Sequence, residues 1–91
     1  INTLIEIKDI LNENSKINLY IEGYSSSDGN ENYNLMLSQK RAESVKSYLI
    51  KLGVDENRLE VISYGELNPI GDNDNPMGRS MNRRVQFKLK K

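Results

Sequence analysis

The sequence contains no cysteine and no histidine. The absence of cysteine excludes disulfides, thiolate metal ligands and a cysteine nucleophile. The absence of histidine removes the commonest general base and the commonest metal ligand, and with them every Ser-His-Asp arrangement. Any catalysis would therefore depend on serine, tyrosine, carboxylates and basic side chains alone.

The chain also lacks an excess of charge of either sign and lacks long apolar runs. Its 13 Lys and Arg residues balance 13 Asp and Glu residues, so no basic field is present to attract nucleic acid or anionic lipid. No apolar run approaches the length of a membrane span, and no leader pattern is present. We therefore predict a soluble chain with no nucleic-acid partner, and contact with a membrane only through parts of the protein outside this chain.

Carboxylates occur in two close pairs, Asp55 with Glu56 and Asp72 with Asp74. Both pairs fall in predicted solvated turns, where nothing raises a carboxyl pKa to the range useful for acid–base catalysis. The run "GDNDNPMG" at residues 71–78 superficially resembles a calcium loop, but Pro76 and the lack of an acidic residue at the twelfth position break that pattern. We predict no catalytic residue, no metal and no cofactor.

The periodicity of apolar residues predicts five elements. A chain of 91 residues forms a single domain, residues 1–91, with one modest core. Spacings of three and four residues predict helices, and alternation predicts strands. The expected order is a helix at residues 2–14, a strand at 17–23, a helix at 31–52, a strand at 59–65 and a strand at 84–89, with a long loop at 66–81.

This order predicts an α+β fold. Strands separated by helices favour crossover units on one sheet, and the last strand can pair antiparallel. We expect a two-layer α/β sandwich with both helices on one face of a mixed sheet. The strand at 59–65 carries bulk on both faces, which is typical of an interior strand. The predicted core consists of Leu19, Ile21, Ala42, Val45, Leu49, Val61, Val85 and Phe87.

Four motifs in this order carry a resemblance to a known family. They are "GYSSSDG" at 23–29, "LSQKRAESVKSYL" at 37–49, "LGVDENRLEVISYGELNPI" at 52–70 and "GRSMNRRVQF" at 78–87. Together they resemble the OmpA C-terminal-like domain, a peptidoglycan-binding module of outer-membrane porins, Pal lipoproteins and MotB-type stators. Such domains usually begin with one more strand, so the resemblance implies a βαβαβ arrangement whose first strand is absent from this chain. It also implies a fragment of a longer envelope protein, located in the periplasm and associated with the outer membrane.

The resemblance also implies a ligand. In this family it is the diaminopimelate of the peptidoglycan stem peptide, which carries an ammonium and a carboxylate on one carbon. A guanidinium and a carboxylate held at a fixed distance suit such a group. The arginine of the family's L-S-x-x-R-A helix falls on Arg41. In the family's loop G-H-T-D-x-x-G, the threonine and aspartate fall on Ser25 and Ser26, so a neutral hydroxyl replaces the expected carboxylate.

Three further residues complete the predicted ligand site. Asn34 matches the family's helix asparagine, Arg83 starts the last strand facing the groove, and Asp28 lies two positions beyond Ser26. Each residue also has a purely structural interpretation. Arg41 could pair with Glu22 or Asp28, Arg83 could form an interstrand salt bridge, and Asp28 and Asn34 could make local turn and helix-start hydrogen bonds.

Three functions follow from the sequence. The first is non-covalent binding of the stem peptide, which anchors an envelope protein to the cell wall. The second is a degenerate scaffold, with protein partners in the envelope, that has lost diaminopimelate binding because Ser26 replaces the aspartate. The third keeps the activity but takes a stem peptide with another diamino acid.

Overall fold

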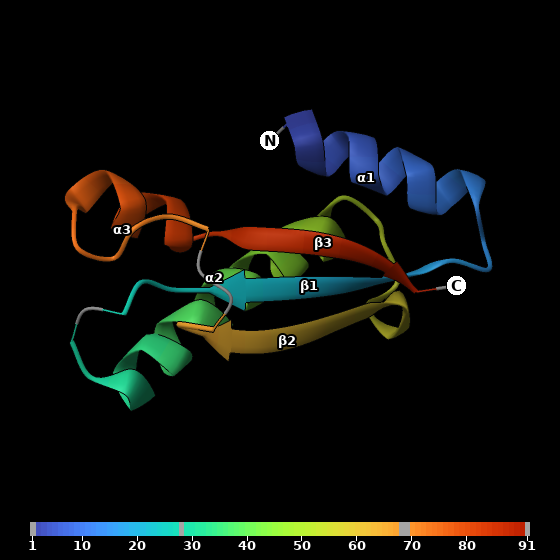
Figure 1. Ribbon diagram of the computed structural model, residues 1–91. Helices are drawn as coiled ribbons and strands as arrows, with labels where there is room; N and C mark the ends of the chain where they lie inside the picture. Colours follow the sequence, from blue (N-terminus) through green and yellow to red (C-terminus); the bar gives the residue numbers. More distant parts are fainter. Residues whose placement is uncertain (1, 28, 68–69, 91) are drawn as a thin grey trace.

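The computed structural model describes residues 2–27, 29–67 and 70–90. It confirms the predicted α+β class and the order of the five predicted elements, and it adds a short third helix (Figure 1). The elements are α1 (Asn2–Glu13), β1 (Asn18–Tyr24), α2 (Glu31–Lys51), the single 3-10 turn η1 (Glu56–Arg58), β2 (Leu59–Gly65), α3 (Pro76–Asn82) and β3 (Val85–Lys90).

The three strands form one mixed sheet in the order β2-β1-β3. β1 pairs parallel with β2, starting with Leu19 opposite Leu59, and antiparallel with β3, with Leu19 opposite Leu89. The interior strand is therefore β1, and the prediction of an interior position for residues 59–65 was wrong. The bulk on the second face of β2 has another cause, because Tyr64 stacks on Tyr24 of β1 with ring centroids 5.1 Å apart.

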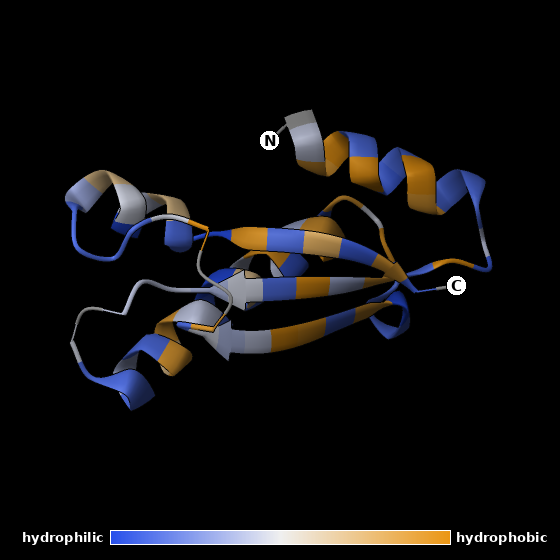
Figure 2. Cartoon of the chain, in the orientation of Figure 1, coloured by the Kyte–Doolittle hydropathy of each residue, from blue (hydrophilic) through white to orange (hydrophobic). Residues whose placement is uncertain are grey.

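The core lies between the sheet and the helices. Apolar and polar residues alternate along the strands (Figure 2), so one face of the sheet is apolar. Leu11 of α1 and Leu49 of α2 are both fully buried in the same cluster, which shows that the two helices share one core. All eight predicted core residues belong to this cluster or pack against it: Leu19, Ile21, Ala42 and Leu49 are buried, and Val45, Val61, Val85 and Phe87 are partly buried.

α2 is fixed closely against the ends of β1 and β2. A Cβ at Gly23 would lie 2.1 Å from the carbonyl oxygen of Ser38, so only glycine allows this approach. The fully buried Ser38 hydroxyl lies 2.6 Å from that of Ser63, and it accepts a hydrogen bond from the backbone N–H of Gly65. The first half of α2 therefore holds a defined position over the end of the sheet.

The helix α3 was not predicted, since residues 66–81 were expected to form a loop. Its sequence does contain a start signal. Asn75 is the N-cap and its side chain accepts from the backbone N–H of Gly78, while Pro76 occupies the first turn. The helix has only 7 residues and no apolar period, so its pattern is too short for periodicity to detect. A Cβ at Gly71 would lie 2.4 Å from the Gly78 carbonyl oxygen, so the preceding loop packs directly on α3.

Candidate ligand-binding site

The candidate site lies at the end of the sheet where β1 leaves and β3 begins. Residues 25–27, which we call the serine loop, and α3 both lie at this end (Figure 1). The backbone N–H of Tyr24 donates to the carbonyl of Arg84, and that of Ser25 donates to the carbonyl of Gly65. The loop therefore starts as a continuation of the sheet, and Ser25 and Ser26 are both buried.

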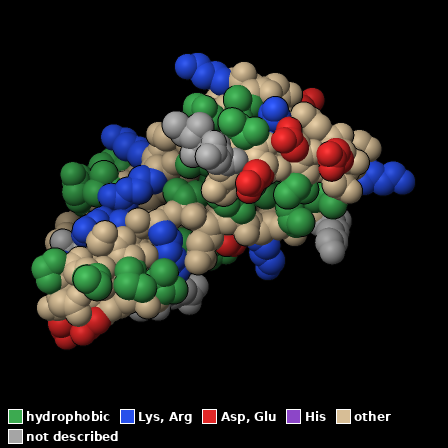
Figure 3. Space-filling model, turned by 90° about the horizontal axis from the view of Figure 1, so that it is seen from above, with side chains coloured by type: hydrophobic (Ala, Val, Ile, Leu, Met, Phe, Trp, Pro, Cys, Tyr) green, Lys and Arg blue, Asp and Glu red, His purple; other side chains and the backbone are tan. Residues whose placement is uncertain are grey.

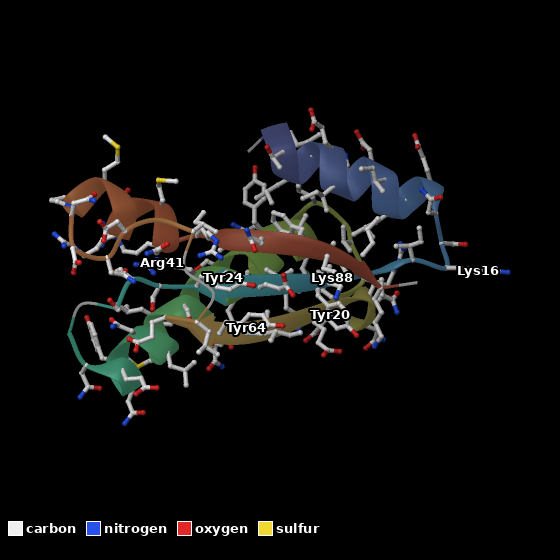
Figure 4. The ribbon with its side chains drawn as sticks, viewed as in Figure 1. Lys16, Tyr20, Tyr24, Arg41, Tyr64 and Lys88 are labelled. Atoms are coloured by element: carbon white, nitrogen blue, oxygen red, sulfur yellow. The ribbon has the colours of Figure 1, made fainter. Side chains whose placement is uncertain are left out.

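Arg41 extends from α2 toward this end of the molecule. It precedes the fully buried Ala42 and is itself half-buried. Figure 4 shows Arg41 close to Tyr24, on the side of α3. Its Nη1 atom is buried and has no hydrogen-bond partner among the described residues. Among the described residues no ion pair joins Arg41 to Glu22, and Glu22 accepts from the hydroxyl of Tyr64 at 3.4 Å.

Arg83 and Ser26 are brought together by the fold. Nη1 of Arg83 donates to the hydroxyl oxygen of Ser26 at 3.3 Å. Arg84 points elsewhere, with its guanidinium carbon 3.8 Å from the centroid of the Tyr24 ring. Arg83 therefore contacts the serine loop, whereas Arg84 lies over the ring of Tyr24. The guanidinium of Arg83 contacts the hydroxyl that replaces the family's carboxylate.

The remaining predicted residues have different positions. Ser25 is buried, and its hydroxyl donates to the carbonyl of Ser26 at 3.2 Å. Asn34 is buried in the first turns of α2, where its backbone N–H donates to the carbonyl of Asn30. Asp28 lies outside the described residues.

Two asparagines of this region were missed by the sequence analysis. Asn82 is fully buried; its Oδ1 accepts from the backbone N–H groups of Ile70 and Gly71, and its Nδ2 donates to the carbonyl of Gly71 and to Oδ1 of Asn73. Asn73 Oδ1 also accepts from the backbone N–H of Ser27 at 3.1 Å. The Asp- and Asn-rich run was interpreted as a solvated turn, and amide-rich composition alone does not show which side chain becomes buried.

Four arginines lie at this end of the molecule, although the chain as a whole is neutral. Arg41, Arg79, Arg83 and Arg84 come from α2, α3 and the start of β3. In the view from above in Figure 3, several Lys and Arg side chains lie close together on one side of the molecule. Such a local concentration of guanidinium groups suits a carboxylate ligand. Nearby, burial raises the pKa of the Tyr64 hydroxyl, and the carboxylate of Glu22 adds to this effect.

A separate hollow of about 220 Å³ lies between the start of α2 and the end of β2. Leu35, Tyr64 and Leu67 are among its lining residues, and none of the predicted ligand residues that the structure describes lines it. Within residues 2–27, 29–67 and 70–90, no cluster of three or more acidic side chains is arranged to hold a metal ion. No helix in the same ranges is long and apolar enough to cross a membrane.

Comparison with known proteins supports the resemblance. The OmpA family matches residues 1–83. "Probable lipoprotein YiaD" of Escherichia coli strain K12 is 41% identical over 88 residues, which are 97% of this chain and 40% of that protein. "Peptidoglycan-binding protein ArfA" of Mycobacterium bovis is 40% identical over 67 residues, which are 74% of this chain and 21% of that protein. The chain thus spans less than half the length of these relatives.

Solved structures show the same fold. The crystal structure of the peptidoglycan-associated lipoprotein from Burkholderia pseudomallei superposes with a TM-score of 0.90 and 30% sequence identity. The superposition covers 96% of this chain and 74% of that one. The α+β fold of this chain is therefore the fold of that lipoprotein.

Proposed function

Because the chain belongs to the OmpA family, we propose that it binds peptidoglycan without covalent chemistry and so anchors a longer envelope protein to the cell wall. The proposed ligand is the stem peptide, through diaminopimelate or another diamino acid. The proposed location is the periplasm, in association with the outer membrane. Relatives named as a lipoprotein, an outer-membrane protein and a porin support this location.

The observation that carries the proposal is the buried Nη1 atom of Arg41, which has no hydrogen-bond partner in the described part of the chain. A buried donor without a partner is costly, by about 1 to 3 kcal/mol or more when the group is charged. A ligand carboxylate would satisfy it with a charge-assisted hydrogen bond. The arrangement therefore favours a ligand whose acidic group reaches Arg41.

Recognition of the ligand's ammonium has to differ from that of relatives with an aspartate in the loop. At Ser26 the ammonium would meet a neutral hydroxyl, which already accepts from the guanidinium of Arg83. The loss of the charge-assisted contact costs about 1 to 2 kcal/mol, or about an order of magnitude in affinity. We therefore expect binding that depends on the ligand's carboxylate more than on its ammonium.

The proposal does not include catalysis. One residue of each carboxylate pair considered from the sequence has a structural role. Asp55 caps η1 by accepting from the backbone N–H of Asn57, and Asp72 accepts from the backbone N–H of Asp74. These hydrogen bonds explain the acidic residues as turn and cap formers.

The contact between Ser26 and Arg83 also favours a second candidate function. A guanidinium at the position of the family's carboxylate repels an ammonium. The domain could then serve as a scaffold for protein partners in the envelope, which would keep the fold but not the binding of stem peptide. This candidate predicts no binding of stem peptide by the unmodified chain.

Calorimetric titration with a diaminopimelate-containing stem peptide tests the proposal. We expect measurable heats for the unmodified chain and a loss of about ten- to a hundredfold in affinity for Arg41→Ala. Lys40→Ala is the matched control, since Lys40 is the exposed neighbouring cation on α2. Equal, negligible heats for all three proteins would favour the scaffold, and an equal effect of both substitutions would indicate a non-specific charge effect.

A further inference from the structure

The side chain of Asn73 joins the serine loop to residues 70–75, the loop that precedes α3. Its Oδ1 accepts two hydrogen bonds, one from the backbone N–H of Ser27 at 3.1 Å and one from Nδ2 of Asn82 at 2.8 Å. Residues that are far apart in the sequence are thereby fixed to each other at the candidate site. The single acceptor atom Oδ1 of Asn73 therefore connects the serine loop to Asn82 of α3.

Asn73 is itself held in place from α3. Its backbone carbonyl accepts from Nη1 of Arg79 at 2.9 Å. Asn82, which is fully buried, bonds the backbone of Gly71 on both its N–H and its carbonyl side. Asn73 is therefore held from α3 at two points: Oδ1 accepts from Nδ2 of Asn82, and the backbone carbonyl accepts from Arg79.

The hydrogen bond to Ser27 has a direct consequence for Ser26. Ser27 is the next residue in the chain, so fixing its N–H restrains the peptide plane that follows Ser26. On the other side, Tyr24 and Ser25 are bonded to β3 and β2. The backbone on both sides of Ser26 is thus determined, and its hydroxyl meets Arg83 at 3.3 Å. Groups that are positioned before a ligand arrives lose less entropy on binding.

We infer that Asn73 is a positioning residue of the ligand site, which holds the serine loop in the conformation that binds stem peptide. This inference rests on the proposed function for its ligand, but the hydrogen bond on which it depends can be tested alone. The role belongs to the acceptor atom, because both partners of Oδ1 are donors. An aspartate at this position keeps the acceptor, whereas an alanine removes it.

Amide hydrogen exchange tests the contact. Ser27 is exposed, so its amide should exchange rapidly unless a hydrogen bond protects it. We expect slow exchange in the unmodified protein and in Asn73→Asp, and fast exchange in Asn73→Ala. Asn14→Ala is the matched control, because Asn14 donates to the carbonyl of Ile10 at the far end of the molecule (Figure 1). Fast exchange of Ser27 in the unmodified protein would overturn the inference without any variant.

Titration with the diaminopimelate-containing peptide tests the consequence. Asn73→Ala removes the hydrogen bonds to Ser27 and to Asn82, and we expect affinity for the peptide to fall roughly two- to tenfold. For Asn73→Asp we expect affinity within about twofold of the unmodified protein, since a charge in a solvated loop is largely screened. If the side chain had only a structural role, Asn73→Ala would lower the stability in urea and leave the affinity of the folded protein for the peptide unchanged.

The outcomes separate the inference from the proposed function. If the peptide binds and Asn73→Ala binds equally well, the inference is wrong and the proposed function is supported. If no variant binds the peptide while Ser27 keeps its protection, the assignment of the ligand is wrong and the hydrogen bond is supported. If Asn73→Asp is as weak as Asn73→Ala, the acceptor role is wrong.

Discussion

Two half-buried arginines lie at opposite ends of the sheet, and their surroundings differ. Arg58 lies where β2 begins, and its Nη2 donates to the backbone carbonyls of Asn14 and Ile17. Arg41 lies near the end of β1, since its neighbour Ala42 packs against Gly23. Arg41 takes part in none of the ion pairs among the described residues, and its Nη1 has no hydrogen-bond partner there.

Burial alone does not separate these two arginines. Each leaves one buried nitrogen without a hydrogen bond, Nε in Arg58 and Nη1 in Arg41. The difference lies in the hydrogen bonds that are made. Arg58 closes the connection between α1 and β1, which is a structural role, whereas we propose that Arg41 binds the ligand. The comparison teaches that substitutions at the two ends should affect different quantities, stability at one and affinity at the other.

The largest expected effect is at Arg41. Arg41→Ala should weaken binding of the stem peptide by about 1.5 to 3 kcal/mol. The free energy of unfolding should stay within about 0.5 kcal/mol, because no hydrogen bond or ion pair with the described residues is lost. Calorimetry and urea denaturation on the same sample measure the two quantities. A large loss of stability with little loss of affinity would make Arg41 structural and remove the difference between the two ends.

Arg58→Ala should show the opposite pattern. Two backbone carbonyls lose their donor, so the free energy of unfolding should fall by about 1 to 3 kcal/mol, with affinity for the peptide unchanged. Lys46→Ala serves as the control, since it removes only an exposed ion pair with Glu56 at 3.9 Å and should cost less than about 1 kcal/mol. Urea denaturation of the three proteins gives the comparison. Weaker peptide binding by Arg58→Ala would contradict the separation of roles.

Ser26→Asp should strengthen binding of the stem peptide at the candidate site. A carboxylate at this position gives Arg83 an ionic partner and returns an acceptor for the ligand's ammonium. Affinity for the diaminopimelate peptide should rise by about 1 to 2 kcal/mol, or up to about tenfold. The control ligand is the same peptide with that amine acetylated, which should show no gain. An equal gain for both ligands would mean that the loop was stiffened rather than given an ammonium site.

The smallest effect is expected at Asn75, the cap of α3. Asn75→Ala removes the acceptor for the backbone N–H of Gly78, and the loss of such a cap costs about 1 kcal/mol. Hydrogen exchange should become faster in α3 and remain unchanged in α1. Faster exchange throughout the protein would show that α3 and the opposite end unfold as one unit.

Local patterns predicted much of the fold because they report on local physics. Alternation at Leu19 and Ile21 identified β1, and helical spacing at Val45 and Leu49 identified α2, and all four residues belong to the core or pack against it. The edge position of β2 was missed because strand order depends on pairing between distant segments. A single strand sequence with bulk on both faces does not reveal which neighbours it has.

The candidate site was predictable only in part. The family pattern pointed to Arg41 and Ser26 as site residues, and the alternation of Arg83 and Arg84 predicted only that their side chains point to opposite faces. The roles of Asn73 and Asn82 could not be predicted, because a buried amide is recognised by its partners rather than by its neighbours in sequence. These partners are backbone groups from separate loops, and only the folded chain brings them together.

The pairing of β1 with β3 also determines when the sheet can form. Asn18 lies opposite Lys90, so this pair joins two segments that are far apart in the sequence. Pairings of such long sequence separation are slow to form because a long loop must be closed first. Until β3 is in place, the central strand β1 has one open edge. In that interval the exposed edge is vulnerable to aggregation, and a binding partner or chaperone that covers it would act on the unfinished domain rather than on the folded one.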